Sequence, residues 1–235
     1  MIRYIGKCLL IEEGKEKILV IGDLHIGLEE SLRESGVFIS AKLVEGMVKE
    51  LEIIFEKTGR VEKVVLLGDL KHYFGKIVGE EWREVLKLFD FLKKKCKKII
   101  VIKGNHDVLI ESITKKRKIV AKKIYVFKNY CFVHGDKDYK EIWSKKIKYV
   151  IVGHGHPAVK LREGVKIEKY KCFLGGKYLG KNWVMLPSFS EYSAGSDPRE
   201  GEVILAWELP LRKFDVKIVG ENLEVLDFGL LGRLN

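Results

Sequence analysis

Residues 18–25 read ILVIGDLH: four consecutive apolar residues, a glycine, and then Asp23 and His25. A short run of β-branched and apolar residues without polar alternation is typical of a strand buried on both faces of a sheet. The glycine lets the chain turn sharply where the strand ends. This stretch therefore predicts a buried strand whose carboxyl end carries two potential metal ligands.

The same pattern of an apolar run followed by a glycine returns along the chain. The further runs lie at residues 64–67, 99–102, 131–133 and 149–152. Between the first three runs, apolar residues recur at helical spacing within residues 39–58 and 80–95. This alternation of strands and helices predicts a largely parallel sheet with right-handed crossovers.

The pattern changes after His156. Short strand-like segments separated by glycine-rich turns follow at residues 165–173, 183–186, 203–207, 214–219 and 223–225. They predict antiparallel β-structure that completes a second sheet. Because no repeat, low-complexity linker or Pro/Ser-rich break interrupts the chain, we expect one α/β domain spanning residues 1–235.

Each apolar run leads into side chains that suit a metal site. These residues are Asp23, His25, Asp69, Asn105, His106, Asp107, His134, His154 and His156. Sites in open α/β sheets form outside the carboxyl ends of the strands, so these residues are expected to converge. A single histidine there is more often an ordinary loop residue, and an aspartate after glycine is commonly a turn or helix cap. Five coordinated strand ends favour a metal site instead.

The residue types constrain the metal. Mixed His, Asp and Asn ligands suit manganese, iron, cobalt, nickel or zinc, and we place manganese first. The absence of cysteine from the set argues against a closed structural zinc site. Since the candidates outnumber the ligands of one tetrahedral ion, two divalent metal ions that share a carboxylate and clamp a phosphate fit better.

These residues also carry a family resemblance. The motifs Asp23-x-His25, Gly68-Asp69, Gly104-Asn105-His106-Asp107, His134 and Gly153-His154-Gly155-His156 resemble the motif set of the calcineurin-like metallophosphoesterase superfamily. The resemblance covers residues 22–156. It implies a four-layer α-β-β-α fold, in which two facing mixed β-sheets are flanked by helices.

The resemblance further implies a role for each position. The two metals would take the ligand sets Asp23, His25 and His156, and Asn105, His134 and His154. Asp69 would bridge both metals, and a metal-bridging hydroxide would attack phosphorus. His106 would donate a proton to the leaving oxygen or stabilise the charge on it. Asp107 would either orient His106 or cap a helix.

Two further segments of the sequence resemble a subgroup of this superfamily. Residues 68–72, ending in His72, resemble the GDLFH motif of double-strand-break repair nucleases, whose histidine lies beside the catalytic one; the alternative for His72 is an exposed loop histidine. Residues 186–189 and Gly195 resemble small archaeal phosphoesterases distantly related to those nucleases, although a simple turn is the alternative. The repair nucleases carry a further C-terminal domain, for which this chain has little room, so processive resection is not expected.

Composition bears on partners and location. The net charge of +11 suits polyanionic partners, but the absence of Gln and the abundance of Lys, Glu and Ile also fit a high-temperature organism. Four widely spaced cysteines and the lack of a membrane-length apolar stretch favour a cytoplasmic protein without a membrane partner.

The leading functional hypothesis is a phosphodiesterase or nuclease-like hydrolase, with a phosphoester substrate such as a nucleic acid or nucleotide. The alternative enzyme is a phosphomonoesterase or cyclic-nucleotide phosphodiesterase acting on a small molecule, and the alternative class is a non-catalytic scaffold. Residues 93–98 and 115–118 form basic clusters. We expect residues 93–98 on the rim opposite the site, and hypothesise that residues 115–118 extend the site for a polyanion. The substrate and the oligomeric state stay open.

Overall fold

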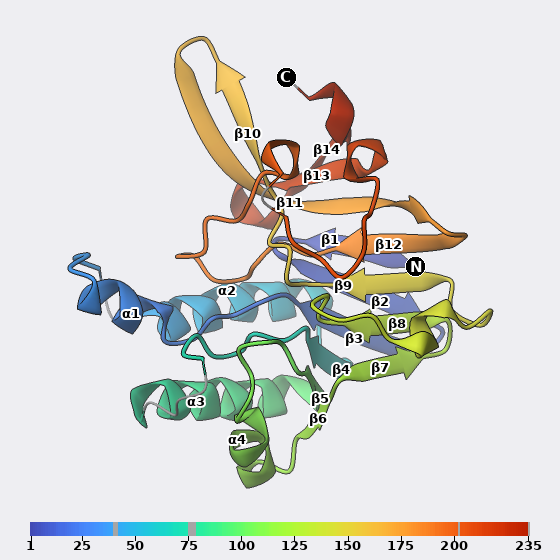
Figure 1. The fold of residues 1–235 in the computed structure, drawn as a ribbon. Helices are drawn as coiled ribbons and strands as arrows, with labels where there is room; N and C mark the ends of the chain where they lie inside the picture. Colours follow the sequence, from blue (N-terminus) through green and yellow to red (C-terminus); the bar gives the residue numbers. More distant parts are fainter. Residues whose placement is uncertain (40–41, 75–78, 202, 235) are drawn as a thin grey trace.

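The computed structural model of the protein describes residues 1–39, 42–74, 79–201 and 203–234. Two β-sheets face each other, and helices cover the outer face of the first sheet (Figure 1). The apolar core between the sheets takes side chains from both, such as Val20 from the first and Phe132 from the second. The predicted arrangement of two facing mixed sheets with flanking helices is confirmed.

Within the described residues, the first sheet has the strand order β1-β2-β3-β4-β5-β6. Its strands are β1 (Ile2–Ile5), β2 (Cys8–Glu13), β3 (Glu16–Ile21), β4 (Val61–Leu66), β5 (Cys96–Ile102) and β6 (Val120–Lys122). Strands β3 to β6 run parallel, whereas β1 and β2 add antiparallel neighbours to β3. The first three predicted apolar runs fall at the carboxyl ends of β3, β4 and β5.

The helices explain why these runs are continuous. They are α1 (Leu28–Glu34), α2 (Leu43–Thr58), α3 (Gly79–Lys95) and α4 (Ile110–Lys116). In β3, Leu19 packs in the core beneath the helices while Val20 packs between the sheets. Because successive side chains of a strand point to opposite faces, a strand covered on both faces needs apolar residues throughout. Helices α2 and α3 match the patterns predicted in residues 39–58 and 80–95, of which residues 40–41 lie outside the described residues.

The second sheet has the order β14-β13-β11-β12-β9-β8-β7 among the residues described, with β10 paired to β11. Its strands are β7 (Ile124–Phe127), β8 (Tyr130–Val133), β9 (Tyr149–Val152), β10 (Ala158–Glu163), β11 (Lys166–Tyr178), β12 (Lys181–Met185), β13 (Asp215–Val219) and β14 (Val225–Leu230). Strands β8, β9 and β12 are parallel, and the pairs from β12 to β14 are antiparallel. The expected antiparallel completion of a second sheet is therefore present.

Short 3-10 helices and extended segments cover the outer face of this second sheet. In the described residues, the 3-10 helices are η1 (Lys140–Trp143), η2 (Pro198–Glu200), η3 (Leu211–Lys213), η4 (Glu221–Leu223) and η5 (Leu231–Arg233). Residues from η1, η3 and η5 pack on the core of that face. The segment predicted at 223–225 becomes a strand only from Val225 onward, since η4 ends at Leu223.

The prediction of a strand at residues 203–207 is wrong. These residues belong to none of the described strands. Instead, Val203, Leu205 and Trp207 pack across the outer face of the second sheet, and Ala206 N donates a hydrogen bond to Gly135 O. The alternation of apolar residues arises because this segment packs on the face of the sheet, and not because it pairs with a strand of the sheet. No helix in the described part of the chain combines the length and apolar character needed to span a membrane.

Candidate metal centre

The predicted site residues lie where strands of both sheets end. Strands β3, β4 and β5 of the first sheet, and β8 and β9 of the second, lead into the loops that carry them. His134 follows β8, and its Nδ1 donates a hydrogen bond of 2.7 Å to the backbone oxygen of Leu67, which follows β4. The carboxyl edges of the two sheets therefore meet, and the site forms between them rather than at the edge of one sheet.

Asp23, His25 and His156 form a first group, with one potential ligand atom from each residue within 4.8 Å of the others. The Nε2 atoms of His25 and His156 are 3.2 Å apart, and His156 Nε2 lies 3.3 Å from Asp23 Oδ1. Asp23 is fully buried, so its carboxylate faces these rings and not solvent. Two imidazoles and a carboxylate that converge in this way suit a divalent cation.

Asp69, His134 and His154 form a second group that meets the same distance criterion. Asp69 Oδ2 lies 3.4 Å from His134 Nε2 and 4.0 Å from His25 Nε2 of the first group. Asn105 joins the second group, because its Oδ1 is 3.1 Å from His134 Nε2. The structure thus brings all seven residues predicted as ligands together, with Asp69 between the two groups.

Two buried carboxylates, those of Asp23 and Asp69, give this region negative charge. Burial alone would raise the pKa of both, but neighbouring histidines, led by His156 for Asp23 and His134 for Asp69, hold each pKa below its usual value. Burial opposes protonation of His134, yet its hydrogen bond with Asp69 and the nearby negative charge raise its pKa to about 10. Burial lowers the pKa of His25 to about 4. Ionised carboxylates and imidazole nitrogens in one buried space fit divalent metals, which would displace the proton of His134.

The backbone is strained at several of these positions. His25, Asp69, His154 and His156 have φ angles of 46°, 45°, 61° and 39°, in the left-handed region. Residues other than glycine rarely adopt it, and such conformations cluster at functional sites. The loops also cross closely, because a Cβ atom on Gly153 would lie 2.7 Å from Asp23 Oδ2.

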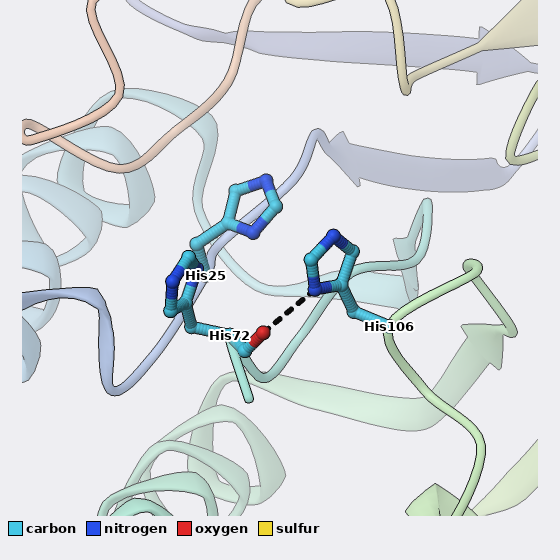
Figure 2. A group of neighbouring side chains, drawn as sticks. All are labelled: His25, His72 and His106. Atoms are coloured by element: carbon cyan, nitrogen blue, oxygen red, sulfur yellow. Dashed lines mark hydrogen bonds between the residues drawn. The ribbon is translucent and has the colours of Figure 1, made fainter. Parts of the chain in front are cut away.

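His106 lies beside this pair of groups, next to His72 and His25 (Figure 2). Its Nδ1 donates a hydrogen bond of 2.6 Å to the backbone oxygen of His72. Its backbone N–H donates to Asp69 Oδ1 at 3.0 Å. The His72 and His106 rings stack with centroids 5.8 Å apart and planes inclined by 23°. The ring of His106 is therefore held at Nδ1, and its Nε2 is available for chemistry.

The carboxylate of Asp107 accepts hydrogen bonds from backbone N–H groups. Its Oδ1 accepts a hydrogen bond of 3.1 Å from Leu70 N, and its Oδ2 accepts one of 3.0 Å from Gly104 N. Helix α4 begins at Ile110 without a side-chain cap. Asp107 therefore fastens the turn that carries His106 to the loop after Asp69, and the backbone of His72 orients the ring.

The segment after β12 supports the first group of candidate ligands. Ser188 Oγ donates a hydrogen bond of 2.9 Å to Asp23 O, and Ser193 Oγ lies 3.3 Å from His156 Nδ1. The ammonium group of Lys171 donates to Ser188 O at 2.8 Å. The roles of Ser193 and Lys171 were not predicted, because no local pattern links a serine or lysine to ligands on other strands.

Comparison with known proteins decides the family. The model of the calcineurin-like phosphoesterase family matches residues 16–220. The chain belongs to this family. It is accordingly a metal-dependent phosphoester hydrolase, and the His and Asp groups described above fit the divalent metals of such an enzyme.

Individual relatives of this calcineurin-like phosphoesterase are distant. A search of curated proteins found no match. Among solved structures, the nuclease MPE from Pseudomonas putida is 19% identical, with 94% of this chain and 99% of that chain covered and a TM-score of 0.59. YfcE, a phosphoesterase from E. coli, is 15% identical, with 91% and 98% covered and a TM-score of 0.43. At 19% identity, the likeness to MPE shows a shared fold.

Three of the basic residues 115–118 of this phosphoesterase, Lys116, Arg117 and Lys118, have neighbours away from the metal centre. Arg117 forms two hydrogen bonds, of 2.6 and 2.8 Å, with the carboxylate of Asp90 on α3. The ammonium group of Lys116 lies 4.4 Å from the centre of the Trp82 ring. Lys118 lines a hollow together with Lys97, at the start of β5 and so at the end opposite the site. This placement argues against the hypothesis that the cluster extends the site.

Proposed function

We propose that this protein is a two-metal phosphodiesterase in which both metals share Asp69. The two ligand sets would be Asp23, His25 and His156, and Asn105, His134 and His154. The observation that carries the proposal is the position of Asp69 Oδ2, 3.4 Å from His134 Nε2 and 4.0 Å from His25 Nε2. One carboxylate within reach of both groups suits a bridging ligand of a two-metal hydrolase.

The residues beside the metals would control the proton. When bound, the metals supply an activated water as nucleophile and neutralise charge on the phosphoryl oxygens. His106 donates its Nδ1–H to His72 O. In its doubly protonated form the ring would give the Nε2 proton to the leaving oxygen and become the neutral Nδ1–H imidazole. The ring of His72 stacks on that of His106 and restricts its rotation, which is the role we propose for His72.

We propose manganese as the native metal and the cytoplasm as the location. The donors are nitrogen and oxygen atoms, and the described groups contain no thiolate. Cys8, Cys96, Cys131 and Cys172 are free and buried, which agrees with a reducing compartment. Elemental analysis of protein purified with manganese should find more than one ion per chain. One ion or fewer, together with full activity, would contradict the two-metal proposal.

We propose a phosphodiester substrate, with nuclease-like activity on short or single-stranded ends. Support comes from the subgroup resemblance of residues 68–72 and from the net charge of +11. In addition, one solved structure with this fold, MPE from Pseudomonas putida, is a nuclease. A small phosphoester is the second candidate, because residues 115–118 lie away from the centre.

Two chromogenic substrates and an oligonucleotide separate these candidates. A phosphodiesterase should hydrolyse bis-p-nitrophenyl phosphate faster than p-nitrophenyl phosphate, and should also cleave a short single-stranded oligonucleotide. Faster hydrolysis of the monoester, with the oligonucleotide left intact, would favour the small-molecule enzyme. Neither substrate reacting in the presence of any of the candidate metals would contradict both.

A further inference from the structure

Glu81 is a buried acid that neither ligand group uses. It lies in the first turn of α3, and only 3% of its surface is exposed. Its Oε1 accepts hydrogen bonds from two consecutive backbone N–H groups, 2.8 Å from His72 N and 3.0 Å from Tyr73 N. Successive N–H groups that point at one oxygen form a small anion-binding concavity, here occupied by a side chain from another element.

The segment that Glu81 holds is the one that orients His106. The backbone oxygen of His72 accepts the Nδ1–H of His106 at 2.6 Å, as the dashed line in Figure 2 shows. The N–H of His72 is shared between Glu81 Oε1 and Ile26 O, the latter at 2.9 Å. The N–H of Tyr73 donates to Glu81. Glu81 is thus two hydrogen bonds away from the ring of His106.

Glu81 also packs against the loop that follows His25. A Cβ atom on Gly27 would lie 3.0 Å from Glu81 Oε1 and 3.3 Å from its Cγ. Gly27 has a φ of 96°, which other residues rarely adopt, so this close approach depends on glycine. The side chain of Glu81 therefore lies between the loop after β3 and the loop after β4.

We propose that Glu81 is a positioning residue for His106: it fixes the backbone of His72 and Tyr73, whose His72 carbonyl sets the orientation of the imidazole. This inference rests on the proposed role of His106 as the proton donor to the leaving oxygen. A proton donor must lie within hydrogen-bond reach of the atom that it protonates, and a displacement of about 1 Å can cost about 10²-fold in rate.

The test uses the dependence of kcat on the leaving group. Protonation matters most for poor leaving groups, so a series of aryl methyl phosphodiesters with increasing leaving-group pKa reports on the donor directly. His106→Asn is the reference and should lose about 10²-fold or more with the poorest leaving group, but little with p-nitrophenolate. Glu81→Ala should also lower kcat most for the poorest leaving group, by about 10-fold, with KM and metal content unchanged.

Three further variants separate positioning from folding. Glu81→Asp keeps the charge, but its shorter side chain cannot reach the N–H groups, so it should behave like Glu81→Ala. Glu81→Gln keeps an oxygen that can accept both hydrogen bonds and should stay near the wild type. Glu80→Ala removes an exposed carboxylate, paired with Arg83, from the same helical turn and should leave the series unchanged.

The outcomes distinguish this inference from the proposed function. If His106→Asn lowers kcat equally across the series, the role of His106 fails and the inference fails with it. If His106→Asn shows the leaving-group effect while Glu81→Ala and Glu81→Asp match the wild type, only the inference is overturned. An equal change in Glu80→Ala would also overturn it, because the effect would then belong to the start of α3 and not to Glu81.

Discussion

Replacing Asp69 by asparagine should weaken metal binding at both ligand groups at once. The substitution keeps the shape of the side chain and an oxygen that can accept the N–H of His106, 3.0 Å away. It removes a negative charge that is only 2% exposed and therefore weakly screened by solvent. Loss of a partner outside the ligand shell lowers metal affinity by about 10–100-fold, so we expect at least about 100-fold per site for this shared ligand.

The size of the effect follows from linkage. At free manganese near 100 times the wild-type Kd, each site adds about 2.7 kcal/mol to the free energy of unfolding. A site that binds about 100-fold more weakly adds only about 0.4 kcal/mol under the same conditions. The two sites together therefore lose about 4.6 kcal/mol, which for a chain of this size corresponds to about 9–18 °C in Tm.

The assay is the rise in Tm on adding manganese to chelator-treated protein. Comparing the rise within each variant removes any change in the stability of the metal-free form. Glu81→Gln is the matched control: Glu81 is also buried, and the amide keeps an oxygen that can accept the N–H groups of His72 and Tyr73, so its rise should persist. A wild-type rise in Asp69→Asn would refute the shared-ligand reasoning, and so would a loss confined to one site.

Four other changes test neighbouring parts of the structure. His106→Asn should retain its metal ions by elemental analysis while kcat on a diester with a poor leaving group falls by about 10²-fold; near-normal turnover would contradict a proton donor. Gly104→Ala would drive a Cβ atom into Asp69 and should abolish metal binding, whereas Gly79→Ala, with no atom within 4 Å, should not. Burial, and to a smaller extent the positive charge of Lys7, lower the pKa of Lys171 to about 7. The unfolded state therefore binds more protons between about pH 7 and 10, so stability should rise with pH, and Lys171→Met should flatten the rise in urea titrations. Replacing residues 115–118 by serine should leave oligonucleotide binding and its salt dependence nearly unchanged, because these residues lie away from the centre; a flatter salt slope would restore them as a binding surface.

The sequence by itself determined the strands that build the site and the kind of chemistry at their ends. Strands covered on both faces must be apolar throughout, so β3, β4, β5, β8 and β9 are visible as continuous runs. Glycine is required where loops from different strands cross, as Gly153 does beside Asp23, so the ligand positions carry a local signature. Both features leave a pattern in consecutive residues, and for that reason the sequence was sufficient to predict them.

Only the tertiary structure decided how these segments meet. An alternating segment such as residues 203–207 can pair within a sheet or pack across its face, and its own residues do not distinguish the two. Likewise, Asp107 accepts hydrogen bonds from backbone N–H groups, while His72 O accepts the Nδ1–H of His106. These partners depend on which loops the two sheets bring together. Glu81 and Ser193 reach the site from outside every motif. Hydrogen bonds between residues distant in sequence depend on the packing of the sheets, and that packing is a property of the whole chain.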